Sequence, residues 1–97
     1  MAGLTRLMRP VVPGVRRFRP QYEEAFRRQM TAQAEGKVVT AADLAQELNA
    51  AAFDANPESA IRSMQRGLKR VAREHERCLN SGIPSPFWTE PNVQSKD

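Results

Sequence analysis

The histidine and the cysteine of this chain are its most reactive side chains, and each occurs once. His75 and Cys78 both fall on the apolar side of a predicted helix. Glu74 and Glu76 flank the histidine, but adjacent side chains on a helix point apart, so neither carboxylate is placed to orient the imidazole. No glycine elbow carries a nucleophile, so a Ser-His-Asp arrangement cannot be built. We interpret both residues as core or interface groups and predict no catalytic residue.

The composition provides few side chains that could bind a metal ion or a cofactor. One histidine and one cysteine cannot form the ligand clusters that hold zinc. The sequence has no glycine-rich phosphate loop and no pair of carboxylates at a spacing suited to acid–base catalysis. We therefore predict no metal site, no cofactor and no small-molecule substrate. A lone cysteine also excludes an internal disulfide, which fits a reducing compartment.

Positive charge is the strongest chemical feature of the sequence, whose net charge is +4. Six basic residues share one side of the same predicted helix, opposite its apolar side: Arg62, Arg66, Lys69, Arg70, Arg73 and Arg77. With no acid expected among them, they repel one another, which indicates a counter-charge from a partner. An acidic protein surface, an anionic lipid surface and the phosphates of ribosomal RNA are the candidates. The alternative is a basic face that meets only water.

A second basic segment precedes the helices. The first 22 residues hold five arginines and no acid: Arg6, Arg9, Arg16, Arg17 and Arg19. An arginine-rich, acid-free N-terminus resembles a mitochondrial targeting segment, although three prolines disfavour the amphipathic helix typical of such segments. The alternative is a plain basic arm. We predict an extended arm over residues 1–20, with its last three arginines as partner-binding residues.

Three helices are predicted to position these groups. The first, near 21–35, follows Pro20, which suits a first helical turn, and it carries one apolar stripe: Tyr22, Phe26 and Met30. The second, near 40–54, begins with a near capping box in which Thr40 precedes Asp43 by three residues. Its apolar stripe is narrow and includes Leu44 and Leu48.

The third helix, near 57–80, has the clearest boundaries. Asn56 is a good N-cap and Pro57 a good first residue, while Gly82 suits the end of the helix. At about 100° per residue, one side is apolar: Ile61, Met64, Leu68, Val71, His75, Cys78 and Leu79. Gly67 costs roughly 1 kcal/mol inside a helix, and we interpret it as a point where another backbone approaches closely.

A proline-rich tail, residues 83–97, follows the third helix. Its three prolines prevent a continuous helix, yet it carries Phe87 and Trp88, the latter being the one tryptophan of the chain. An aromatic pair in such a tail can bury its surface by inserting into a groove. We therefore predict both residues to be partner-binding.

Together these elements predict an all-α fold, a single small helical domain over 1–97 with extended proline-rich ends. Leu, Ile, Val and Phe number 19 of the 97 residues, a content near that of disordered chains, so the core is thin. No apolar run approaches the roughly 18 residues that span a bilayer. The composition argues against a free-standing enzyme and favours a small basic part of a larger assembly.

The N-terminal half resembles the LYR-motif family of small mitochondrial proteins. The motif-like segments are Leu4-Thr5-Arg6 with Arg9, Tyr22-Glu23-Glu24-Ala25-Phe26-Arg27-Arg28, and a third-helix pattern of Ile61, Met64, Arg66, Gly67 and Val71. Thr5 stands where the family has tyrosine. The resemblance implies a three-helix accessory subunit or assembly factor, and many such proteins bind the mitochondrial acyl carrier protein through basic helix faces.

The C-terminal third is similar to a small helical subunit on the matrix side of the cytochrome bc1 complex. The similarity rests on the basic run from Lys69 to Arg73, followed by Ile83-Pro84 and then Trp88-Thr89. Both resemblances imply a mitochondrial multi-subunit assembly. The function expected is therefore that of a non-catalytic accessory subunit, most readily of a respiratory-chain complex. A mitochondrial ribosomal protein that contacts rRNA and an LYR-type assembly factor are the alternatives.

Overall fold

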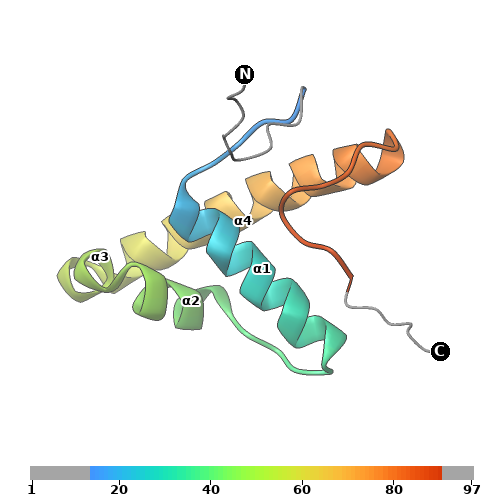
Figure 1. Cartoon of the computed structure of the whole chain (residues 1–97). Helices are drawn as coiled ribbons and strands as arrows, with labels where there is room; N and C mark the ends of the chain where they lie inside the picture. The colour runs from blue at the N-terminus through green and yellow to red at the C-terminus, as the bar shows by residue number, and fades with distance from the viewer. Residues whose placement is uncertain (1–13, 91–97) are drawn as a thin grey trace, which may run out of the picture.

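The computed structural model describes residues 14–90, which form four helices: α1 (Pro20–Ala34), α2 (Ala41–Leu48), α3 (Ala50–Ala55) and α4 (Pro57–Asn80). No strand occurs in this range, so the predicted all-α class is confirmed. The longest helix is α4; α1 crosses it, while α2 and α3 lie beside its N-terminal part (Figure 1). Within the same range, no helix is both long enough and apolar enough to cross a membrane. Arg6 and Arg9 lie outside the described residues.

The predicted bounds of α4 are confirmed at both ends. The Asn56 side chain accepts a hydrogen bond from the Ser59 N–H at 3.2 Å, and Pro57 occupies the first turn. The apolar side is buried as predicted at five positions: Met64, Leu68, Val71, His75 and Cys78. Leu79 differs: its side chain is 59 % exposed, although Cys78 on the same last turn of α4 is buried.

The first predicted helix is present as α1, and its apolar stripe faces the core. Phe26 is buried, and Tyr22 and Met30 pack against the same cluster. The helix ends at Ala34, just before Gly36, whose φ of +77° is a left-handed value that favours glycine. The sequence signals at both ends of this helix therefore act as predicted.

The second predicted helix is present but is divided at Asn49. The capping box forms, with the Asp43 N–H 3.1 Å from the Thr40 hydroxyl oxygen. At Asn49, φ is −143° and ψ is 49°, which separates α2 from α3. α2 buries Leu44 and Ala45, whereas α3 has no fully buried residue and packs against the core through the partly buried Phe53. Asparagine competes for backbone hydrogen bonds and is a weak helix former.

Gly67 marks a close approach, but by a side chain and not by the backbone that was predicted. A Cβ atom at this position would lie 2.4 Å from Cδ1 of Tyr22. The aromatic ring of α1 therefore rests directly on the backbone of α4. A hydrogen in place of a methyl group lets the two helices come this close.

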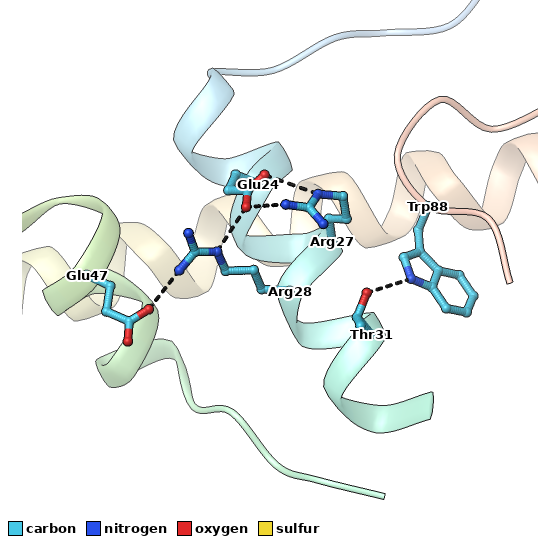
Figure 2. Close-up of polar contacts among 6 residues, drawn as sticks. All are labelled: Glu24, Arg27, Arg28, Thr31, Glu47 and Trp88. Carbon is cyan, nitrogen blue, oxygen red and sulfur yellow. Dashed lines mark hydrogen bonds and ion pairs between the residues drawn. The ribbon is translucent and has the colours of Figure 1, made fainter. Parts of the chain in front are cut away.

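Polar contacts join α1 to its neighbours on both sides (Figure 2). Nη1 of Arg28 lies 2.8 Å from Oε1 of Glu47 on α2, and Glu24 accepts from both Arg27 and Arg28. Toward the tail, the indole N–H of Trp88 donates to the Thr31 hydroxyl at 3.2 Å. Exposed ion pairs contribute under about 1 kcal/mol each, so the helices are held together chiefly by the buried cluster.

Candidate functional site

All six basic side chains predicted on the outer face of α4 are exposed: Arg62, Arg66, Lys69, Arg70, Arg73 and Arg77. One of them, Arg77, has an ion pair, with Nη2 2.6 Å from Oε2 of Glu74. This corrects the expectation that no acid falls among them, because the i, i+3 spacing brings Glu74 to Arg77. The other five have no carboxylate within 4 Å among residues 14–90.

Glu74 also fastens the N-terminal arm to α4. The Arg16 backbone N–H donates to Oε2 of Glu74 at 2.9 Å, and the Arg77 guanidinium donates to the Gly14 carbonyl oxygen. The hydrogen bond from Arg77, supported by the Arg16 N–H, lowers the pKa of Glu74 to about 2. The segment that was predicted as an extended arm thus runs, over residues 14–19, alongside the basic face of α4 (Figure 1).

A second acid, Glu23, holds the other end of the arm. The Arg17 guanidinium donates to both of its carboxylate oxygens, at 3.0 and 2.7 Å, and the Phe18 N–H donates at 2.8 Å. Burial alone would raise the pKa of Glu23, but these hydrogen bonds outweigh it and the pKa lies below its ordinary value. Arg17 also lies 5.6 Å from the ring centroid of Phe87, within cation–π range. Arg17 therefore serves the fold of the arm.

The arm, the first turn of α1 and α4 together line a half-open cavity of about 500 Å³. The arm contributes Arg16, Arg17 and Arg19, and α4 contributes Arg66 and Arg70, so five of the predicted partner-binding arginines meet at one place. The remaining walls are formed by Phe18, Tyr22, Ser63 and Gly67. Nothing in the sequence pattern linked the two basic segments, because they lie more than forty positions apart.

Other predicted partner-binding residues lie away from this cavity. Arg73 lines an adjoining hollow of about 250 Å³ with Arg16 and Arg70. Three basic residues of α4 line neither hollow: Arg62, Lys69 and Arg77.

The aromatic pair of the tail occupies a groove in its own chain. Phe87 is 3 % exposed and belongs to the core cluster, 5.9 Å from the Phe18 ring. Trp88 is half-buried beside α1 (Figure 2). This corrects the prediction that Phe87 anchors in a partner, because Phe87 has almost no surface left to offer. The partner-binding role of Trp88 stays a prediction. The tail folds back since burying a phenyl ring contributes roughly 1.5–3 kcal/mol.

His75 is part of the same internal packing. Its Nδ1 atom lies 2.6 Å from the Ser85 hydroxyl oxygen, and its ring packs against Phe26 and Trp88. Burial lowers the pKa of His75, which favours the neutral imidazole. Cys78 is buried in the next turn. Among residues 14–90, no three His, Cys, Asp or Glu side chains are grouped so that they could hold a metal ion.

Comparison of the chain with protein-family models, curated proteins and solved structures finds no match. The similarities to the LYR-motif family and to a bc1 subunit therefore remain predictions. The functional interpretation is based on the geometry of the arginine-lined cavity.

Acidification toward pH 2 is expected to break the contact between Glu74 and the arm. The pKa of Glu74 is about 2 in the folded chain against an ordinary value of 4.5. The contact therefore stabilises the arm fully above pH 4.5 and loses its effect as the pH falls toward 2. The NMR shift of the Arg16 amide proton should titrate with a midpoint near this lower value. Glu74→Gln should abolish that titration, and the control Glu76→Gln should preserve it; a midpoint near 4.5 would contradict the contact.

Proposed function

We propose that this protein is a non-catalytic accessory subunit of a mitochondrial multi-subunit complex, most readily a respiratory-chain complex. It would lie peripherally on the matrix side of the inner membrane and brace neighbouring subunits. The observation that carries the proposal is the convergence of two basic segments on one surface, where among the described residues only Arg17 and Arg77 of these segments have a carboxylate within 4 Å. Such a surface is best used against an acidic neighbour.

Two features favour attachment over a merely solvated face. First, Glu74 on α4 binds the backbone of the arm, and Glu23 on α1 binds Arg17 and the Phe18 N–H. These contacts place the arginines of the arm beside those of α4 and so increase the density of positive charge there. Second, the concentrated charge repels itself, a cost that an acidic partner relieves. The mitochondrial assignment is supported by the arginine-rich, acid-free start of the chain.

The test is retention in the native complex after charge reversal. Arg66, Arg70 and Arg73 are changed together to Glu, and the fraction of tagged subunit in the large complex is measured on a native gel. We expect nearly complete release, because attraction becomes repulsion at three adjoining positions. Arg66→Ala alone should change retention little, since one exposed pair contributes under about 1 kcal/mol.

The matched control changes the same three residues to Lys. It keeps the charge and should be retained like the wild type, while circular dichroism verifies the fold of every variant. Retention of the Glu variant would show that the surface is solvated and would contradict the proposal. Recovery of ribosomal RNA with the wild type, lost steeply as salt rises, would instead support the ribosomal alternative.

A further inference from the structure

The cavity between the arm and α4 carries more positive charge than the described chain balances. Five arginines line it, and one of them, Arg17, is neutralised by Glu23. The four that remain have no carboxylate within 4 Å among residues 14–90: Arg16, Arg19, Arg66 and Arg70. Glu74, which contacts the arm, is engaged by Arg77 and by the Arg16 N–H. The cavity is therefore suited to bind an anion that the described chain does not supply.

We propose that this cavity binds a phosphate-bearing ligand, of the class of diphosphates and phosphate monoesters. A single carboxylate would leave most of the four free guanidinium groups unbalanced. A phosphate monoester carries about 1.5 to 2 negative charges and three strong acceptor oxygens, and a diphosphate carries more. The planar fork of N–H donors on arginine matches phosphate oxygens in pairs.

The shape of the cavity also suits a ligand larger than a simple ion. Its volume of about 500 Å³ lies within the range of small-molecule sites, roughly 300–1,000 Å³. Ser63 adds a hydroxyl donor to the wall, while Phe18 and Tyr22 add apolar surface for the group that bears the phosphate.

The cavity exists before any ligand arrives. Its arm wall is fastened at Arg16 by Glu74 and at Phe18 by Glu23, and its helix wall is fixed where Tyr22 meets Gly67. A preformed site loses less conformational freedom on binding.

The direct test is calorimetric titration of the full chain with inorganic pyrophosphate at about 150 mM salt, where exposed charges are screened. The double variant Arg66→Gln/Arg70→Gln removes two cavity arginines. The matched control, Arg62→Gln/Lys69→Gln, removes two exposed charges of the same helix that line no part of the cavity. We expect the cavity variant to bind at least about tenfold more weakly and the control to change by less than about threefold. Acetate, with one charge, should bind much more weakly than pyrophosphate.

A free organic phosphate and a phospholipid headgroup share this chemistry, and vesicles distinguish them. The wild type and both double variants are floated with phosphatidylcholine vesicles that contain phosphatidic acid. Binding that pyrophosphate displaces and that the cavity variant loses would identify the headgroup as the source. Pyrophosphate binding without vesicle binding would identify a free phosphate. Both outcomes support the site.

Two results would overturn the site: no heat of pyrophosphate binding in the wild type, or equal weakening in the two double variants. Equal weakening would mean that the attraction belongs to the whole basic face and not to the cavity. This proposal goes beyond the proposed function, because it assigns a phosphate-bearing ligand to the cavity, whereas the proposed function places an acidic neighbouring subunit against the basic surface. The two proposals can fail independently. Pyrophosphate binding is measured on the isolated chain, whereas release of the variant with Arg66, Arg70 and Arg73 changed to Glu is measured on the complex.

Discussion

Replacing Val71 by aspartate is expected to abolish the folded structure. Val71 is 0 % exposed and lies in the middle of α4, within the cluster that joins all the packed elements. A carboxylate there would be buried without a partner, at a cost of several kcal/mol. A domain of this size has a free energy of unfolding of about 5–15 kcal/mol, so one such change removes much or all of it. Thermal unfolding followed by circular dichroism should lose its cooperative transition.

The neighbouring residue provides the matched control. Ala72 is exposed on the same turn of α4, so Ala72→Asp introduces the same charge without burying it. Its effect should stay within about 0.5 kcal/mol, as is usual for surface substitutions. A Val71→Asp variant that unfolds as cooperatively as the Ala72→Asp variant would show that this side of α4 is not the core of the chain.

Gly67→Ala is expected to destabilise the protein, although alanine is the better helix former. The new Cβ atom would lie 2.4 Å from Cδ1 and 2.5 Å from Cγ of Tyr22, so the ring must move. Overpacking of this kind typically costs about 1–3 kcal/mol. The gain in helix propensity, up to about 1 kcal/mol, offsets only part of that cost. Chemical denaturation of each variant gives the change in the free energy of unfolding.

The sign of the Gly67 effect should reverse when the ring is removed. In a Tyr22→Ala background, Gly67→Ala should stabilise the chain by up to about 1 kcal/mol, because the helix gains alanine and no atom opposes the methyl group. The double-mutant cycle therefore isolates the contact between α1 and α4. Destabilisation of equal size in both backgrounds would contradict the contact.

Local signals in the sequence determined the helices. The Asn56-Pro57 start of α4 and the capping box of Thr40 and Asp43 act between residues three positions apart or closer, so no distant segment is needed for them to operate. Apolar periodicity likewise identified the buried side of α4. It could not show that, in the last turn, Cys78 is buried while Leu79 stays exposed. The break at Asn49 was also missed, because asparagine is a weak helix former but does not by itself end a helix.

The candidate site was decided by the tertiary structure. The sequence determined that arginines concentrate in the arm and on one face of α4, since composition and helical spacing are local properties. It did not determine that the two meet, because the contact between Arg16 and Glu74 joins residues 58 positions apart. Nor did it determine which groove Phe87 fills. The apolar character of a side chain indicates that it will be buried, but not which residues will cover it. Long-range packing against α4 made those choices, and with them it formed the cavity.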